Sequence, residues 1–204
     1  MARNDSSPLV LVAGASGVIG RRLLPELIGR GYRVLGLTRS HRNVQLIERL
    51  GATAVVCDVY DAPALQAVFK NRAPEIVVDL LTDLPDEADL IAEFANANNS
   101  IRTLGTDNLL EAASRTGTKR IVAESVAWDL PGEGALAVEH LEKAVLSAGG
   151  IVLRYGQLWG DGTYHRVRPS AGPTLAVEEA GRLTMGYIGA ESGIYELTDQ
   201  PLRA

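Results

Sequence analysis

The chain has 204 residues, which suits a single domain with a core of ordinary size. Hydrophobic residues make up 46% and charged residues 22%, a globular balance that argues against large-scale disorder. The net charge of −5, with the basic residues scattered along the chain, argues against a nucleic-acid-binding protein.

Short apolar runs alternate along the chain with longer amphipathic stretches. A polar segment, residues 1–8, comes first and is predicted to be a disordered tail ahead of one domain over residues 9–204. The runs are rich in Val, Ile and Leu and show little polar alternation, which is typical of parallel strands buried on both faces. They lie at Leu9–Ala13, Val34–Leu37, Ala54–Cys57, Ile76–Leu81, Ile121–Ala123 and Ile151–Leu153.

The stretches between these runs place apolar residues on one helical face. The first helix begins near Val18 and contains Pro25, which is expected to bend it. Further helices are predicted at residues 44–50, 62–72, 87–116 and 141–145. Repeated strand–helix–strand units imply right-handed crossovers, so the predicted fold class is α/β, a Rossmann-type doubly wound parallel sheet.

The last third of the chain changes character. Residues 160–173 are rich in Gly, Pro and Arg and are predicted to be a loop, followed by a helix near Ala176–Tyr187 and a strand at Ile194–Leu197. We expect residues 155–204 to contribute a small, reduced C-terminal substrate-binding region. The residues expected in its lid are Tyr164, His165, Arg166 and Arg168. The two arginines either bind an anionic substrate or are solvated.

The strongest motif follows the first strand directly. It reads GxxGxxG and opens the first predicted helix, the context in which such a motif binds a dinucleotide. Gly14 permits a tight exit from the strand, Gly17 lets the backbone approach a diphosphate, and Gly20 lets helix and strand pack closely. The helix N-terminus then offers free N–H groups to the phosphates. The residues predicted to bind the cofactor here are Gly14, Ser16, Gly17, Val18, Ile19 and Gly20. The alternative is a glycine-rich turn without a ligand.

The second strand ends in Thr38, Arg39 and Ser40, without the acidic residue expected for a ribose 2′-hydroxyl. A guanidinium with neighbouring hydroxyls suits a 2′-phosphate, and Arg39 can also stack on adenine. NADP(H) is therefore favoured as the cofactor. NAD(H) is the alternative cofactor, and a solvated basic loop is the alternative structure.

The third strand ends at Cys57, which is followed by Asp58 and Val59. Asp58 is predicted to accept a hydrogen bond from the adenine amino group, with Val59 beside the ring. The alternative is that Asp58 caps the helix at residues 62–72. Cys57 is interpreted as a small buried apolar residue. As the one cysteine it excludes an intrachain disulfide, which fits a cytoplasmic location.

Together these segments resemble the short-chain dehydrogenase/reductase superfamily, in the extended or atypical branch that includes the NAD(P)-dependent epimerase/dehydratase proteins. The resemblance covers most of the chain. It is carried by the segments Gly14–Gly20, Val77–Leu81, Gly105–Ala113, Arg120–Ser125, Leu153–Gly160 and Val177–Ala180. It implies a cofactor at the carboxyl ends of the strands. Leu80 and Leu81 would then lie beside the adenosine ribose, and Tyr155 in the segment that passes the nicotinamide.

The chemistry of this family uses a tyrosine four residues before a lysine, and this pair is missing. The window between Ser125 and Ile151 holds no tyrosine and one lysine, Lys143. Aligning backwards from the later segments places Gly134 and Val138 at the tyrosine and lysine positions. The sequence therefore leaves open which group transfers a proton.

Three interpretations of the missing pair are compatible with the residues. In the first, Glu139 or His140 acts as acid or base in altered chemistry, while Ser125 holds a substrate carbonyl. In the second, Trp128 or Asp129 lines a repurposed pocket. In the third, the site is catalytically silent.

Simpler structural roles compete with these interpretations. Glu139 and Lys143 have the spacing of a stabilising surface pair on a helix, and Ser125 can cap the turn that follows its strand. Asp83 either faces the pocket or caps a helix after Pro85, as Asp86 also can.

Two functions follow from the sequence. The first is an NADP(H)-dependent oxidoreductase or epimerase/dehydratase-like enzyme acting on a small carbonyl or hydroxyl substrate. The second is a non-catalytic NADP(H)-binding regulator that senses redox state. No metal site is predicted, and no membrane partner, because no apolar run is long enough to span a bilayer. The helix at residues 87–116 pairs subunits in many relatives, so the resemblance implies a homodimer.

Overall fold

The computed structural model describes residues 7–85 and 87–199, and within them the chain forms a seven-stranded parallel sheet. Its strand order is β3-β2-β1-β4-β5-β6-β9. The strands are β1 Leu9–Ala13, β2 Arg33–Thr38, β3 Thr53–Val56, β4 Ile76–Asp79, β5 Arg120–Val126, β6 Ile151–Tyr155 and β9 Gly193–Leu197. After β3 the chain crosses back to the other side of β1, so the strand order reverses between β1 and β4. Ligands of open α/β sheets bind at this kind of switch point.

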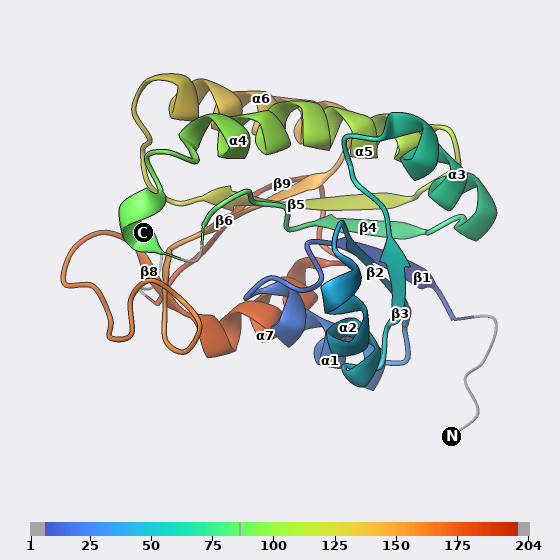
Figure 1. Cartoon of the computed structure of the whole chain (residues 1–204), viewed down its shortest axis with the longest axis horizontal. Helices are drawn as coiled ribbons and strands as arrows, with labels where there is room; N and C mark the ends of the chain where they lie inside the picture. The colour runs from blue at the N-terminus through green and yellow to red at the C-terminus, as the bar shows by residue number, and fades with distance from the viewer. Residues whose placement is uncertain (1–6, 86, 200–204) are drawn as a thin grey trace.

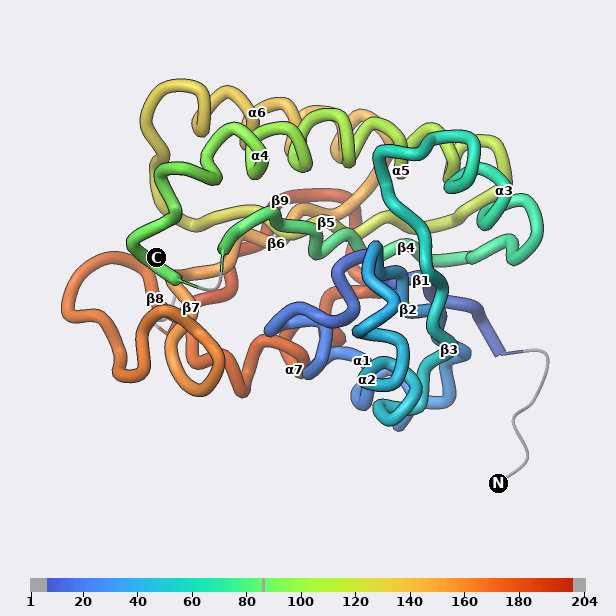
Figure 2. The backbone as a smooth tube through the Cα atoms, viewed as in Figure 1, coloured from blue at the N-terminus to red at the C-terminus, as the bar shows by residue number. Residues whose placement is uncertain are grey.

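Helices cover both faces of the sheet, as Figures 1 and 2 show. One layer holds α1 Gly20–Gly29, α2 Val44–Arg49 and α7 Val177–Tyr187. The other holds α3 Ala62–Arg72, α4 Ala95–Ser100, α5 Thr106–Ser114 and α6 Gly132–Ser147. Alternate residues of β1 enter opposite cores: Val10 and Val12 pack toward α1 and α7, Leu11 and Ala13 toward α3 and α5. Burial on both faces explains why the strands read as uninterrupted apolar runs.

The predicted strands and most helices are confirmed, but the long predicted helix at residues 87–116 is wrong in detail. Residues 88–90 form a short 3₁₀ turn, and regular helix begins only at Ala95. A π-helical turn over Ile101–Gly105 then joins α4 to α5. The residues before Ala95 are better helix formers than the Asn-rich α4, so helix propensity does not explain the late start. Such turns are frequent at functional sites, and this one brings Arg102 to the buried face of the helix.

The last third contains two short strands that the apolar pattern does not reveal. β7 Gln157–Trp159 and β8 Thr174–Ala176 pair in parallel and bracket the predicted loop. The Asp199 carboxylate holds them together, accepting hydrogen bonds from Trp159 Nε1 at 2.6 Å and from the Thr174 hydroxyl at 3.1 Å. Three-residue strands are too short to give a periodic signal.

The structure describes only part of each chain end. Of the predicted tail, residues 1–6 lie outside the described residues, whereas the Ser7 carbonyl accepts a hydrogen bond from Arg33 Nε at 3.0 Å. At the other end, residues 200–204 also lie outside. None of the helices in the described part of the chain combines the length and apolar character needed to cross a membrane.

Candidate cofactor and active site

The glycine turn lies at the carboxyl end of β1, and its three glycines have different steric surroundings. Gly14 has φ +79°, and a Cβ added there would lie 2.4 Å from the Leu80 carbonyl oxygen. A Cβ on Gly20 would lie 2.4 Å from the Gly14 oxygen. At Gly17 the same atom would meet only the Gly14 oxygen, at 3.2 Å. Gly14 and Gly20 therefore serve packing, while Gly17 leaves open space beside its backbone.

The N-terminus of α1 and the side chain of Arg21 directly follow this turn in the chain. α1 begins at Gly20, slightly later than predicted, and its N-cap residue Ile19 makes no side-chain cap. The Arg21 Nε is buried and has no hydrogen-bond partner among the described residues. A helix N-terminus with an unpaired guanidinium donor beside it suits an anion. The residues present here fit a dinucleotide diphosphate.

The predicted 2′-phosphate residues belong to a small polar network. Asn43 Nδ2 donates to Ser16 Oγ at 3.0 Å and to Thr38 Oγ1 at 3.3 Å, which joins the glycine turn to the end of β2. Ser40 accepts from the Arg42 backbone N–H and so caps the 3₁₀ turn that follows. The sequence reasoning missed Asn43, although its place one turn after the end of β2 was a usable signal.

Arg39 makes an ion pair across the end of β1. Its guanidinium donates to both Asp83 oxygens, at 2.7 and 3.2 Å, and so joins the residue after β2 to the loop after β4. The Arg39 side chain is 59% exposed, and its bond to Asp83 raises its pKa. Of the two roles considered for Asp83, the structure shows a carboxylate facing the switch point. Asp86 lies outside the described residues.

The alternative role of Asp58 as a helix cap is wrong. The N-cap of α3 is Asp61, which accepts from the Ala64 N–H at 3.0 Å, whereas Asp58 accepts from the Tyr60 N–H. Asp58 therefore closes its own turn beside Val59, which is buried. Cys57 is buried, as predicted, and burial raises the pKa of its thiol.

The predicted catalytic serine is engaged in a buried network. Ser125 Oγ donates to Glu142 Oε1 at 2.6 Å, and Arg154 donates to both Glu142 oxygens, at 2.8 and 2.6 Å. Burial opposes ionisation of Glu142, but the bonds from Arg154 and Ser125 outweigh it and lower the pKa of that carboxyl. Ser125 is 1% exposed, so in this structure its hydroxyl joins β5 to α6.

The structure does not bring Glu139 and His140 to Ser125. His140 Nε2 lies 2.8 Å from Asp107 Oδ1, across from α6 to α5. Glu139 is exposed and lines a groove of about 620 Å³ between α6 and the β6–β9 edge of the sheet, which Trp128 and Asp129 also line. No ion pair joins Glu139 to Lys143 in the part of the chain described. The three predicted catalytic residues therefore do not form one cluster.

The segment expected beside the ribose, Leu80 and Leu81, lies next to the glycine turn. The Leu80 N–H donates to the Ala13 carbonyl at 3.0 Å, and the Leu81 N–H to Asp79 Oδ1 at 3.1 Å. The Tyr155 ring instead packs in the core, where its hydroxyl lies 2.5 Å from Thr184 Oγ1. Burial raises the pKa of Tyr155. A cofactor could meet Tyr155 only through its backbone in this structure.

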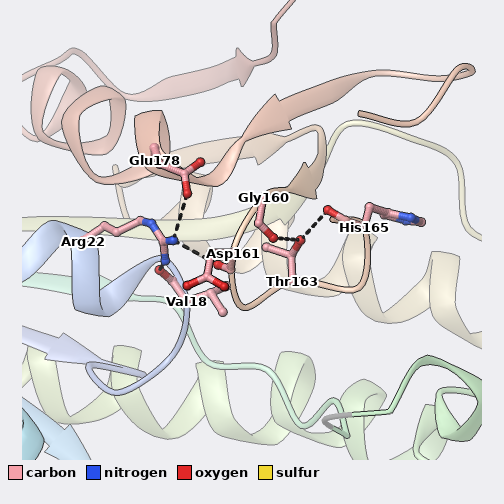
Figure 3. Close-up of polar contacts among 7 residues, drawn as sticks. All are labelled: Val18, Arg22, Gly160, Asp161, Thr163, His165 and Glu178. Carbon is pink, nitrogen blue, oxygen red and sulfur yellow. Dashed lines mark hydrogen bonds and ion pairs between the residues drawn. The ribbon is translucent and has the colours of Figure 1, made fainter. Parts of the chain in front are cut away.

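The predicted lid is tied down beside the glycine turn, as Figure 3 shows. Arg22 donates to the Val18 carbonyl at 2.9 Å and to the Asp161 carbonyl at 3.0 Å, and it pairs with Glu178 at 3.3 Å. The Thr163 hydroxyl lies 3.0 Å from the Gly160 carbonyl, within the same loop. The loop is therefore anchored to α1 and α7.

Other contacts of the lid close it over the carboxyl edge. The Tyr164 hydroxyl donates to the Pro85 carbonyl, so this loop meets the loop after β4. Arg168 donates to the Thr174 hydroxyl at 2.9 Å and lies 3.6 Å from Asp199. Arg168 therefore contacts the β7–β8 pair, and its side chain is 46% exposed, so its two expected roles, solvated or anion-binding, stay predictions.

Asp79 is buried at the end of β4, where it accepts from the Leu81 N–H and from the Thr106 hydroxyl at 3.3 Å. Burial raises the pKa of Asp79 to about 6, above its ordinary value of 3.8. The folded state therefore binds this proton more tightly than the unfolded state. Its contribution to stability is fully present below the ordinary pKa and is lost as the pH rises through about 6.

The substitution Asp79→Asn removes this dependence. Relative to wild type, the free energy of unfolding of the variant should rise by roughly 3 kcal/mol between about pH 4 and pH 8, at about 1.4 kcal/mol per pKa unit. Urea unfolding at a series of pH values measures the difference. If the difference in free energy of unfolding between the two proteins does not change with pH, Asp79 has the same pKa in the folded and unfolded states.

The strand order, the glycine turn at the end of β1 and the open space at Gly17 define a dinucleotide-binding Rossmann domain. The model of the NAD dependent epimerase/dehydratase family matches residues 10–128, more than half of the chain. The chain belongs to this family. Among the described residues, no group of three or more His, Cys, Asp or Glu could hold a metal ion.

Similar proteins agree with this assignment. The chain is 36% identical over 206 residues to a 3-diazoavenalumate denitrifying reductase from Streptomyces sp, covering 89% of this chain and 65% of that relative. It spans only 36% and 35% of a Dictyostelium discoideum sterol-4-alpha-carboxylate 3-dehydrogenase and a rice cinnamoyl-CoA reductase.

Solved structures share the fold at low identity. A UDP-glucose 4-epimerase from Thermotoga maritima, solved with UDP-glucose, has a TM-score of 0.77 at 16% identity, over 93% of this chain and 76% of that one. The Thermus thermophilus UDP-glucose 4-epimerase, in complex with NAD, has a TM-score of 0.75 at 18% identity, over 93% and 77%.

Proposed function

We propose that this chain binds NADP(H) and catalyses reduction of a small acceptor. The observation that carries the proposal is the open backbone at Gly17, with the Arg39 guanidinium at the end of the neighbouring strand. Family membership supports a nicotinamide dinucleotide, and the 36% identical reductase supports the reductive direction. The epimerase/dehydratase-like alternative of the same family uses the same cofactor site.

Each part of the cofactor has a matching group in the chain. The Gly17 backbone and the N-terminus of α1 would hold the diphosphate, and Thr38, Arg39 and Ser40 the 2′-phosphate. Asp58 and Val59 would face adenine, and the backbone of Leu80 and Leu81 the ribose. The bound cofactor would supply a hydride from its nicotinamide ring.

Arg39 gives this proposal a direct test. Arg39→Ala is expected to weaken NADPH binding about 10- to 100-fold and to leave NADH binding nearly unchanged, because charge-assisted bonds to the 2′-phosphate are lost. Asp83→Asn should strengthen NADPH binding, because it frees Arg39 from its ion pair. Fluorescence titration of both cofactors measures the affinities.

The matched control is Arg72→Ala, an exposed arginine at the end of α3. It removes the same charge without touching the switch point, so both affinities should stay at the wild-type value. Equal losses of NADPH and NADH affinity in Arg39→Ala would contradict a 2′-phosphate site.

The acceptor must take up one hydride and one proton. A carbonyl does so to become an alcohol. A diazo group does so when a proton adds to its carbon and a hydride then displaces dinitrogen, which leaves with the carbon–nitrogen electron pair. The name of the 36% identical relative makes a diazo compound that carries a carboxylate the first acceptor class to test.

The second candidate function is a redox-sensing regulator without turnover, and the missing tyrosine–lysine pair favours it. NADPH oxidation with a diazo compound that carries a carboxylate, an aryl aldehyde and a quinone separates the two. Acceptor-dependent oxidation supports the reductase. Tight NADPH binding without oxidation by any of the three supports the regulator.

Two expectations about the protein's context accompany this proposal. We infer a homodimer packed through the α4–α5–α6 layer, where Leu104 and Leu136 are 52% and 58% exposed.

We also infer a cytoplasmic location, because the single buried thiol of Cys57 fits a reducing compartment.

A further inference from the structure

A three-residue segment after β4, residues 83–85, is held from two sides. On one side the guanidinium of Arg39 donates to both Asp83 oxygens, at 2.7 and 3.2 Å. On the other side the hydroxyl of Tyr164, a residue of the lid, donates to the Pro85 carbonyl. The residue predicted to bind the 2′-phosphate and the lid therefore contact the same short segment.

The backbone of this segment has little freedom of its own. The Asp83 N–H donates to Asn98 Oδ1 at 3.1 Å, and Asn98 is buried in α4. The ring of Pro85 fixes its φ angle, and Leu84 is restricted to extended conformations because a proline follows it. A stiff connector of this kind transmits a change at the Asp83 carboxylate to the Pro85 carbonyl.

The lid has a second anchor that does not involve this segment. Figure 3 shows Arg22 of α1 donating to the Asp161 carbonyl, at 3.0 Å, and pairing with Glu178 of α7 at 3.3 Å. This anchor contacts neither Arg39 nor residues 83–85. A change at the Arg39 ion pair therefore reaches the lid through Tyr164.

The ion pair that holds the segment is open to competition. The Arg39 side chain is 59% exposed and the Asp83 side chain 14% exposed, so solvent screens the pair and limits its strength. A 2′-phosphate carries more charge than a carboxylate and also accepts two bonds from one guanidinium. Asp83 and a 2′-phosphate would thus compete for the same donors of Arg39.

We propose that Tyr164 is a positioning residue for cofactor selectivity. By holding the Pro85 carbonyl, it keeps the Asp83 carboxylate on Arg39, where this carboxylate opposes binding of the 2′-phosphate. This inference rests on the proposed NADP(H)-binding function. Because coupling between two sites is reciprocal, a 2′-phosphate that takes Arg39 from Asp83 also weakens the Tyr164 contact and loosens the lid. NAD(H) lacks this phosphate and leaves the lid held.

The selectivity ratio, defined as the Kd of NADH divided by the Kd of NADPH, tests the positioning role. Tyr164→Phe should raise this ratio by about two- to fivefold, the range expected from weakening an exposed ion pair. The double variant Tyr164→Phe/Asp83→Asn should have the same ratio as Asp83→Asn alone, since Tyr164 acts through the Asp83 carboxylate. Fluorescence titration of the four proteins with both nucleotides measures the ratios.

Tyr195→Phe is the matched control for the loss of a tyrosine hydroxyl. The Tyr195 hydroxyl donates to the Glu191 carbonyl at 3.1 Å, at the β9 edge of the sheet. This variant should keep the wild-type ratio. The proposal is overturned if Tyr164→Phe changes both affinities by the same factor, or if the effects of Tyr164→Phe and Asp83→Asn on the ratio multiply as independent changes do.

Trypsin cleavage after Arg166 reports on the lid directly, because Arg166 is exposed in the lid two residues after Tyr164. Cleavage of a folded protein follows the population of locally open molecules. At saturation, NADP+ should increase the rate of this cut about threefold relative to NAD+. Without nucleotide, Asp83→Asn and Tyr164→Phe should each cut faster than wild type, whereas Tyr195→Phe should not. Mass spectrometry identifies the fragment that ends at Arg166.

The two measurements separate failure of this inference from failure of the proposed function. If neither nucleotide binds, NADP(H) binding is refuted, and faster cleavage of Asp83→Asn without nucleotide still supports the link between the segment and the lid. If NADPH binds more tightly than NADH, but Tyr164→Phe keeps the wild-type ratio and both nucleotides give equal cleavage, the proposed function stands and the role of Tyr164 is refuted.

Discussion

Gly17→Asp is expected to weaken NADPH binding by at least ~100-fold while the domain stays folded, because charge-assisted bonds to the diphosphate are each worth about 1.5–3 kcal/mol. At this position an added Cβ meets only the Gly14 oxygen, at 3.2 Å, so a small local shift accommodates it. The new carboxylate then fills the space beside the backbone and repels the phosphates.

Gly14→Ala is the matched contrast in the same turn. Gly14 has φ +79°, and a Cβ there would overlap the Leu80 carbonyl oxygen at 2.4 Å. This variant should lose stability as well as binding, since neither backbone segment can move freely. Thermal unfolding and NADPH titration of both variants check the distinction. Equal destabilisation of the two would show that Gly17 serves packing and not ligand access.

Arg154→Met is expected to destabilise the domain by about 2–3 kcal/mol, because it leaves the Glu142 charge buried with only the Ser125 hydroxyl as partner. The Arg154 side chain is 35% exposed, so solvent screening keeps the loss below that of a fully buried pair. The lost contact joins β6 to α6, outside the cofactor turn. NADPH affinity of the folded variant should therefore be close to wild type.

The pH dependence of this loss has a definite sign. The pKa of Glu142 is lowered in the folded state, so its contribution is present above the ordinary value of 4.5 and disappears as the pH falls. Urea unfolding should show a smaller difference between wild type and Arg154→Met at acid pH than at neutral pH. The double variant Glu142→Leu/Arg154→Met should recover stability, because no unpaired charge remains. A double variant no more stable than the single one would contradict this account.

The sheet and the glycine turn were predictable from the sequence because they depend on local properties. Apolar runs such as Leu9–Ala13 show burial on both faces, and the GxxGxxG motif lies directly after a strand. Right-handed crossovers then restrict the topologies that the sheet can adopt, but they fix neither its strand order nor its register. The bounds of the helix predicted at residues 87–116 were harder to obtain, since helix propensity does not mark its start at Ala95 and a π turn leaves the apolar pattern almost intact.

The partners of the site residues were not predictable in the same way. Arg39 meets Asp83 across 44 residues of sequence, and His140 meets Asp107 across 33. Such contacts depend on which strands are neighbours and on where each side chain points. Ser125 looked catalytic because it ends a strand at the ligand edge, yet its hydroxyl is bonded to Glu142.

Calorimetric titration of the wild-type protein with NADPH and NADH, at about 0.15 M salt, is the most direct measurement of cofactor recognition. The guanidinium of Arg39 and the vacant backbone donors of the first βα turn predict saturable binding of both, with NADPH tighter by at least ~10-fold. Failure of both nucleotides to bind at millimolar concentration, or tighter binding of NADH, would contradict the account.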